Sequence, residues 1–194
     1  MEICTKKNIK GTLMNTRKVY RYKCLYMDIA ERVAEMSHAQ RLKVGAVIVR
    51  DGRIISMGWN GMPAGWDNEC EEARWHVDSE EETRVTRAEV LHAESNAISK
   101  LARSTENGLD AEMFCTHNPC MECAKLIYQS GIKKVYYKTE YRDLGGIGFL
   151  DKSIEIEHMI DHRVDPKMNP EDPPSIFNGG LSDNEHYGNS GVGG

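Results

Sequence analysis

The sequence lacks the features that mark membrane, secreted and nucleic-acid-binding proteins. Its uncharged apolar runs, such as residues 44–49, are far below the roughly 20 residues that a bilayer-spanning helix needs. Its 6 cysteines show no framework spacing and no apolar signal segment opens the chain, so we expect a reducing, cytoplasmic environment. Lys and Arg number 25 against 30 Asp and Glu, a net charge of −5, which offers no general attraction for phosphate polymers. We therefore expect neither a membrane nor a nucleic-acid partner.

The two ends of the chain show little apolar periodicity, which leaves one domain between them. Residues 1–21 carry basic side chains with only Glu2 as counter-charge. We predict a mobile basic leader there, in preference to an arm that contacts phosphates or a neighbouring subunit. Residues 163–194 are rich in Pro, Asn, Asp and Gly and are predicted to be disordered. Residues 22–162 are long enough for one well-buried domain.

Hydrophobic periodicity within residues 22–162 predicts helices and strands in alternation. Apolar residues recur at helical spacing over 22–36, and two β-branched runs at 44–50 and 53–59 are separated by Asp51-Gly52, a strong hairpin signal. The remaining elements are expected as a helix from residue 92, a strand at 112–116, a helix at 120–130, a strand at 134–137, a short helix within 140–152 and an edge strand at 154–159. This order predicts the α/β class, a three-layer α/β/α fold with a mixed five-stranded sheet.

An acidic insertion interrupts this pattern at residues 66–91. It holds nine acids against three arginines and is long for a connection in a compact domain, so we expect a lid or a partly disordered segment. Cys70 and His76 raise the alternative of a second metal site. A lone Cys and a lone His in a polar loop do not make a convincing ligand set, and no second zinc is evident.

The segments H-A-E at 92–94 and P-C-M-E-C at 119–123 carry the strongest chemical signal. One imidazole and two thiolates, from His92, Cys120 and Cys123, suit Zn²⁺ and leave its fourth tetrahedral position for water. Cys120 and Cys123 are three residues apart and share a helix face, and Pro119 is well placed to begin that helix. His92 and Glu94 are two residues apart, so they must converge at a helix entry rather than on a side face. Glu94 is the predicted proton carrier.

A closed structural zinc site is the alternative. Cys115 and His117 would lie on the same side of a strand over 113–117 and are the candidates for a fourth protein ligand. Such a site would leave Glu94 without a purpose, so we favour the open site, which implies catalysis. H-x-E followed by P-C-x-x-C is the signature of zinc deaminases.

With these motifs the chain resembles the cytidine deaminase superfamily and, within it, the deoxycytidylate (dCMP) deaminases, phage members included. The resemblance covers about residues 22–160 and rests on four groups of residues: Lys43-Val44-Gly45-Ala46, the segment 58–65, His92-Ala93-Glu94 with Asn96-Ala97-Ile98, and 119–125 with Gly131-Ile132-Lys133-Lys134. It implies hydrolysis of dCMP to dUMP and ammonia for thymidylate synthesis, in the cytoplasm, or in the host cytoplasm for a virus. It also implies a homohexamer that dCTP activates and dTTP inhibits, with Mg²⁺ accompanying the triphosphate.

The resemblance assigns roles to individual residues. It makes His92, Cys120 and Cys123 the zinc ligands and Glu94 the general acid/base, in agreement with the residue chemistry. It places Asn60 and Tyr141 against the substrate and Arg103 at a position linked to effector control. The effector-binding turn corresponds to Gly61, Met62, Pro63, Ala64 and Gly65.

Each of the roles outside the metal site has a plainer alternative. Asn60 can hold a turn, Tyr141 can be edge packing, and Arg103 can be a solvated charge. On composition alone the 60–65 loop is a connecting turn, although its glycines and backbone amides also suit a phosphate. Asn118 departs from the serine often found before Pro-Cys, which bears on regulation more than on chemistry.

The predicted mechanism has metal-activated water attacking C4 of cytosine while Glu94 relays a proton to N3 and then to the departing amine. Two other functions compete with this interpretation. A nucleic-acid-editing cytosine or adenine deaminase would use the same centre, but the acidic charge balance disfavours it. A zinc-binding protein without catalysis would require a fourth protein ligand.

Overall fold

The computed structural model describes residues 5–76 and 81–159. These ranges contain the helices α1 to α4 and the strands β1 to β7. No helix within them is both long and apolar enough to cross a membrane. The tail predicted at 163–194 lies outside the described residues.

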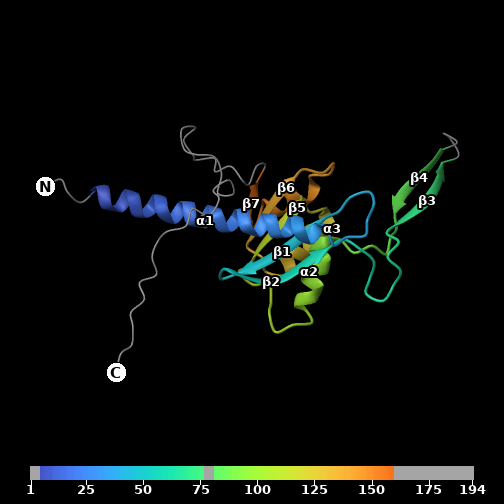
Figure 1. Cartoon of the computed structure of the whole chain (residues 1–194), viewed down its shortest axis with the longest axis horizontal. Helices are drawn as coiled ribbons and strands as arrows, with labels where there is room; N and C mark the ends of the chain where they lie inside the picture. Colours follow the sequence, from blue (N-terminus) through green and yellow to red (C-terminus); the bar gives the residue numbers. More distant parts are fainter. Residues whose placement is uncertain (1–4, 77–80, 160–194) are drawn as a thin grey trace, which may run out of the picture. The chain divides into compact units, whose positions relative to one another are not determined.

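A mixed five-stranded sheet forms the centre of the fold, in the strand order β2-β1-β5-β6-β7 (Figure 1). The strands are β1 (Gly45–Arg50), β2 (Arg53–Trp59), β5 (Glu112–His117), β6 (Lys134–Thr139) and β7 (Glu155–His158). β1 pairs antiparallel with β2 and β5, whereas β6 pairs parallel with β5 and β7. The predicted mixed five-stranded sheet is confirmed.

The hairpin of β1 and β2 follows directly from its sequence. Ala46, Val47 and Ile48 are fully buried, as expected for a strand covered on both faces. In the turn, Asp51 has a φ of 51° and Gly52 a φ of 74°. Both central residues thus take the left-handed angles that a type I′ hairpin requires.

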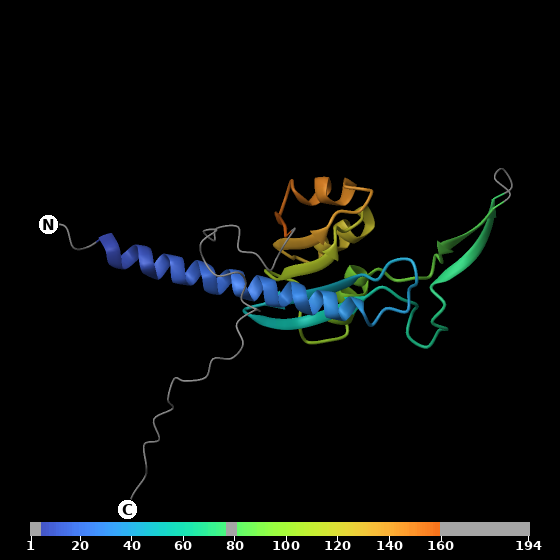
Figure 2. The same cartoon turned by 45° about the horizontal axis from the view of Figure 1, so that its top comes forward.

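Helices cover both faces of the sheet (Figure 2). The helices are α1 (Thr5–Ala34), α2 (Ala93–Leu101), α3 (Met121–Gln129) and α4 (Gly145–Leu150). On the face covered by α1, Met27 packs with Phe114 in one buried cluster. On the opposite face, Ala97 and Ile127 pack with Met113 in a second cluster. The predicted three-layer α/β/α arrangement is therefore confirmed.

Two glycines allow backbones to approach closely beside the metal motifs. A Cβ on Gly58 of β2 would lie 2.3 Å from the carbonyl oxygen of Ala93 in α2. A Cβ on Gly146 of α4 would lie 2.2 Å from the carbonyl oxygen of Pro119. The first turn of α2 thus packs directly against the backbone of β2, and the chain that enters α3 packs against the backbone of α4. These contacts help to hold the starts of the two helices in place.

The N-terminal helix is longer than the sequence predicts. It begins at Thr5 rather than near Tyr22, so the helix predicted from residue 22 also includes residues 5–21 of the basic leader. Lys, Arg and Leu have good helix propensity, and extending an anchored helix costs less than nucleating a new one. Because residues 5–21 carry no apolar stripe, their helical structure leaves no periodic signal in the sequence.

The acidic insertion contains regular structure. Strands β3 (Glu71–His76) and β4 (Glu81–Thr86) form a two-stranded antiparallel ribbon that pairs with no strand of the central sheet (Figure 1). These two segments are therefore regular strands rather than disordered chain, and a role of the insertion as a lid stays a prediction. Most side chains on both strands are exposed and polar. The sequence therefore lacks the alternation of apolar and polar residues that would predict a strand. Among the side chains that the structure describes, no second group of three metal ligands is present.

Candidate metal centre and substrate cavity

The residues of the predicted metal site lie at the starts of two helices. His92 is the N-terminal cap of α2 and Cys120 the N-terminal cap of α3, and both have extended backbone angles. Cys123 follows in the first turn of α3. The His92 Nδ1 atom lies 3.4 Å from the Sγ atom of Cys120 and 3.4 Å from that of Cys123. The fold therefore brings together three side chains that are 28 and 31 residues apart in sequence.

The spacing of these donor atoms fits zinc. All three lie within 4.8 Å of one another, and tetrahedral geometry with ordinary zinc–nitrogen and zinc–sulfur bonds separates such donors by about 3.5 Å. In the described part of the chain, neither Cys115 nor His117 belongs to this group. His117 Nδ1 instead lies 3.1 Å from the hydroxyl oxygen of Thr116. The donor set is therefore that of an open site, with one position left for water.

Burial sets the proton affinities around the centre. It raises the pKa of the Cys123 thiol, and the nearby carboxylate of Glu94 raises it further. A buried thiol of this kind ionises only with help from positive charge, which a divalent cation and a helix N-terminus both supply. Cys123 would therefore bind as a thiolate only together with a cation.

Glu94 is a buried carboxyl group beside the ligands, and only 4% of its surface is exposed. Burial raises its pKa, while a backbone hydrogen bond, the charge of His92 and a hydrogen bond with Cys123 act in the opposite direction. A carboxyl group with a raised pKa can accept and release a proton near neutral pH. The position and environment of Glu94 suit a proton carrier.

A cavity of about 370 Å³ opens onto this centre, within the size range of small-ligand sites. Its wall includes His92, Cys120 and Glu94. The remaining lining residues come from several separate segments of the chain. They are Ala39, Arg41, Leu42, Val44, Asn60, Glu71, Thr86, Val90, Ala93, His117, Asn118, Tyr141 and Arg142.

Asn60 lines the cavity and also holds the neighbouring backbone. Its Nδ2 donates to the carbonyl oxygen of Leu42 at 2.8 Å, and its Oδ1 accepts from the amide of Val44 at 2.8 Å. The plainer role, that of supporting a turn, is thus present. One amide hydrogen and one oxygen lone pair can still serve a ligand, so contact with the substrate stays a prediction.

Tyr141 also lines the cavity, although 47% of its surface is exposed. Its backbone amide donates to Oδ1 of Asn118, and Nδ2 of Asn118 donates to the carbonyl oxygen of Asp143 at 2.8 Å. The unusual asparagine before Pro119 therefore fixes the segment that carries Tyr141. A serine at this position is too short to offer both hydrogen bonds.

The predicted effector residues lie elsewhere. Gly61 pairs through its backbone with Leu91, and Met62 packs against a small buried cluster that includes Cys70. Neither the 61–65 turn nor Arg103 lines the cavity. Gly65 has a φ of 90°, a left-handed angle that favours glycine. The turn thus lies outside the cavity lining, although Gly61 pairs with the residue that directly precedes His92.

Two cavity residues of clear chemical importance were missed by the sequence analysis. Arg41 and Arg142 are both among the residues that line the cavity. No local pattern marks Arg41, because loops and the β3–β4 ribbon meet around it only in the folded chain. Arg142 is adjacent to Tyr141, which the family resemblance did indicate.

One imidazole, two thiols and a buried carboxyl group meet at the starts of two helices that pack on a mixed sheet. This arrangement defines the class of zinc-dependent deaminases. Residues 21–139 match the family described as the cytidine and deoxycytidylate deaminase zinc-binding region. The chain belongs to this family.

Several relatives have been named or solved. Deoxycytidylate deaminase of Mycobacterium phage D29 is 36% identical over 121 residues, which cover 59% of this chain and 92% of that protein. The crystal structure of dCMP deaminase from the cyanophage S-TIM5 in complex with dCMP and dUMP has a TM-score of 0.64 at 42% identity and covers 72% of this chain and 97% of that one. ComE operon protein 2 of Bacillus subtilis is 38% identical over 117 residues, 60% of this chain, but the match spans only 59% of its length.

Proposed function

We propose that the protein converts dCMP to dUMP and ammonia in a zinc-dependent reaction. The observation that carries this proposal is the group His92, Cys120 and Cys123 beside the buried Glu94, at a cavity that His92, Glu94 and Cys120 line. The similarity to phage deoxycytidylate deaminases and to a structure that holds dCMP and dUMP supports the choice of substrate.

The chain's own residues perform binding and proton transfer. His92, Cys120 and Cys123 would hold the metal, which when bound would act as a Lewis acid and lower the pKa of water. Glu94 accepts a proton from the attacking water and delivers it to N3, and then accepts the proton of the hydroxyl group now on C4 and delivers it to the amino group. A carbon–oxygen bond forms at C4, the carbon–nitrogen bond breaks, and ammonia leaves. Burial of Glu94 excludes bulk water from these transfers.

The cavity also suits a monophosphate. Arg41 and Arg142 line it, and guanidinium groups bind phosphate oxygens strongly and with defined geometry. The lining also includes Glu71 and Glu94, but Glu71 binds the backbone amides of Gln40 and Arg41 and Glu94 lies beside the metal ligands. We infer that the two arginines favour a nucleotide over a nucleoside.

The test is ammonia release by the zinc-loaded protein from dCMP, CMP, deoxycytidine and a cytosine-containing oligonucleotide. We expect dCMP to be the best substrate by kcat/KM. Faster reaction with the oligonucleotide would favour the nucleic-acid-editing alternative. Absence of ammonia release from all four, with zinc bound, would overturn the proposal and favour a non-catalytic zinc protein.

We further propose that dCTP activates and dTTP inhibits the enzyme, with Mg²⁺ bound to the triphosphate. The 61–65 turn and Arg103 would form the effector site, since both lie outside the substrate cavity. A homohexamer would transmit the signal, and exposed apolar side chains on α1, Val19, Tyr22 and Leu25, offer surface for subunit contact. The enzyme would act in the cytoplasm, or the host cytoplasm for a virus, and supply dUMP for thymidylate synthesis.

This regulation is tested by titrating dCMP at several dCTP concentrations, with and without Mg²⁺. An effector shifts a conformational population only by its differential affinity for the two states. Activation should therefore fade once dCMP is saturating. Curves that superimpose at every dCTP concentration would show that the switch is absent, without affecting the zinc chemistry.

A further inference from the structure

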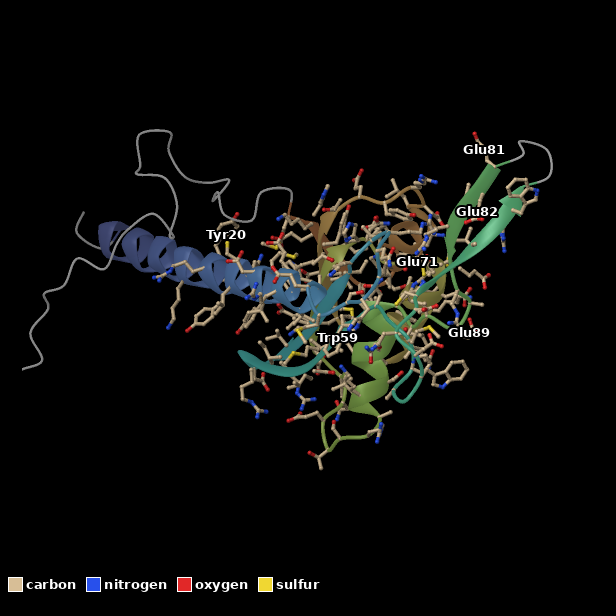
Figure 3. The ribbon with its side chains drawn as sticks, turned by 45° about the vertical axis from the view of Figure 1, so that its right-hand side comes forward. Tyr20, Trp59, Glu71, Glu81, Glu82 and Glu89 are labelled. Atoms are coloured by element: carbon tan, nitrogen blue, oxygen red, sulfur yellow. The ribbon has the colours of Figure 1, made fainter. Side chains whose placement is uncertain are left out.

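The base of the β3–β4 ribbon reaches the substrate cavity. Glu71 and Thr86 are cross-strand partners at the first rung of the ribbon, and both line the cavity. Figure 3 shows Glu71 where the ribbon joins the domain, with Glu81 and Glu82 toward the opposite end. The insertion therefore contributes directly to the wall of the site.

Glu71 fixes the backbone of the segment that precedes β1. Its Oε1 accepts hydrogen bonds from the amide of Gln40 at 3.0 Å and from the amide of Arg41 at 3.2 Å. The Glu71 side chain is buried in this position, with 9% of the residue exposed. A buried carboxylate that accepts two backbone amides holds those amides firmly, because charge-assisted hydrogen bonds are roughly twice as strong as neutral ones.

Thr86 fixes the side chain of the same arginine. The Nη1 atom of Arg41 donates to the Thr86 hydroxyl oxygen at 3.1 Å. Arg84 lies two residues before Thr86 on β4, and its Nη1 atom donates to the Oε1 atom of Gln40 at 3.0 Å. Both the backbone and the guanidinium of Arg41 are thus tied to the ribbon rather than to the central sheet.

The geometry points to a role for these contacts in substrate selection. We propose that Glu71 and Thr86 are positioning residues that hold Arg41 ready for the substrate's phosphate, so that the ribbon sets the preference for nucleotide over nucleoside. This inference rests on the proposed function for the identity of the substrate. Arginine has many rotamers, and fixing its guanidinium before binding reduces the entropy lost when the phosphate arrives.

The structure also shows how the ribbon keeps its own base in place. The amide of Arg87 donates to the carbonyl oxygen of Cys70 at 3.0 Å, which closes the ribbon just beyond its first rung. Cys70 is buried with Ala39 and Val90 in a small apolar cluster. Ala39 immediately precedes the two amides that Glu71 binds, so the ribbon base and the Arg41 segment share this packing.

The experiment measures binding of dUMP and of deoxyuridine to the zinc-loaded full chain by calorimetry. The two ligands differ only in the phosphate, so the ratio of their affinities reports phosphate recognition without requiring turnover. We expect Arg41→Ala to reduce dUMP affinity by about 10- to 100-fold and Thr86→Val by about 3-fold, as loss of a charged and of a weaker hydrogen bond implies. Deoxyuridine affinity should stay within twofold in both.

Glu71 provides a graded series with a matched control. Glu71→Ala should weaken dUMP binding by about 10-fold, and Glu71→Gln should restore part of the loss because it keeps an acceptor oxygen. Glu72→Gln changes the adjacent exposed carboxylate on the same strand and should bind both ligands as the wild type does. In kinetics with dCMP, the positioning variants should raise KM while kcat and zinc content stay near wild-type values.

The outcomes separate the alternatives. Equal weakening of dUMP and deoxyuridine would indicate a merely structural role and overturn the inference, as would unchanged dUMP affinity in both Glu71→Ala and Thr86→Val. Equal affinity of the wild type for the two ligands would also overturn it. Failure of the wild type to deaminate dCMP would contradict the proposed function, whereas the binding ratio would still decide the role of the ribbon.

Discussion

Glu94 combines a fixed position with a proton affinity suited to catalysis. It lies in the first turn of α2, two residues after a metal ligand, and its carboxyl group is buried against Cys123. Burial raises its pKa above that of an exposed glutamate, because a buried site disfavours the ionised form.

Glu94→Gln should keep zinc and fold but lose nearly all turnover. Glutamine has the same shape and cannot carry the proton, so we expect kcat for ammonia release to fall by about 10²- to 10⁴-fold. Glu122→Gln is the matched control, since Glu122 occupies the equivalent position in the first turn of α3 but is exposed. Wild-type turnover in Glu94→Gln, with zinc bound, would exclude the proposed mechanism.

Cys120→Ala and Cys123→Ala should each lose zinc and activity, because three protein ligands are the minimum that the open site supplies. Stability should fall as well, since ligation joins α2 to α3. Cys115→Ala tests the closed-site alternative: it removes a buried core thiol but should retain one zinc per chain. Elemental analysis decides, and full zinc occupancy in either Cys120→Ala or Cys123→Ala would contradict the ligand assignment.

At the scale of elements, the packing of α2 on β2 determines where His92 lies. Gly58 makes this packing possible because the helix backbone occupies the space that a side chain would need. The position of His92 thus depends on a glycine that belongs neither to the group of metal-binding side chains nor to the cavity lining.

Gly58→Ala should lower the free energy of unfolding by about 1–3 kcal/mol, the usual cost of overpacking. It should also weaken zinc binding, since the added Cβ would lie 2.3 Å from the Ala93 carbonyl and 2.5 Å from the Ala97 amide. Gly148→Ala is the control: no atom lies within 4 Å of its added Cβ, and its backbone is helical. Urea unfolding and zinc titration measure both effects, and equal behaviour of the two variants would show that the close approach carries no cost.

At the scale of the whole domain, an ion-pair network ties the two ends of the fold together. Glu157 on β7 accepts hydrogen bonds from Lys23 of α1 and pairs with Lys134 of β6. Burial alone would raise the pKa of Glu157, but the hydrogen bonds and charges of Lys23 and Lys134 outweigh it and hold the pKa below 4.5. The ionised form of Glu157 is therefore stabilised in the folded protein relative to the unfolded chain.

Glu157→Gln should destabilise the protein at neutral pH but not in acid. Because the folded pKa is depressed, the stabilisation by Glu157 is present above its unfolded value near 4.5 and is lost as pH falls through the lower folded value. Unfolding by urea at pH 7 and at pH 3 should show a difference from wild type only at pH 7. Glu155 is an exposed partner of Lys134 on the same strand as Glu157, so Glu155→Gln should have a smaller effect. A destabilisation by Glu157→Gln that persists unchanged at pH 3 would exclude the ionic origin.

The sequence by itself determined the centre of the fold and the metal ligands. The β1–β2 hairpin was predictable because Asp51-Gly52 and the β-branched runs act locally. The ligands His92, Cys120 and Cys123 were predictable because their chemistry and spacing are specific even without contacts. The same local signals failed for residues 5–21 and for the ribbon, where no apolar period is visible in the sequence.

The tertiary structure alone decided what surrounds the metal. Arg41, Glu71 and Thr86 belong to separate segments, and no sequence period relates a loop before β1 to the first rung of a distant ribbon. Asn118 looked like a departure from the family pattern until the fold showed both ends of its amide bound to the 141–143 segment. Metal ligation depends on a few strongly interacting atoms that chemistry identifies one by one, whereas the shape and charge of the cavity depend on which loops the sheet and helices bring together.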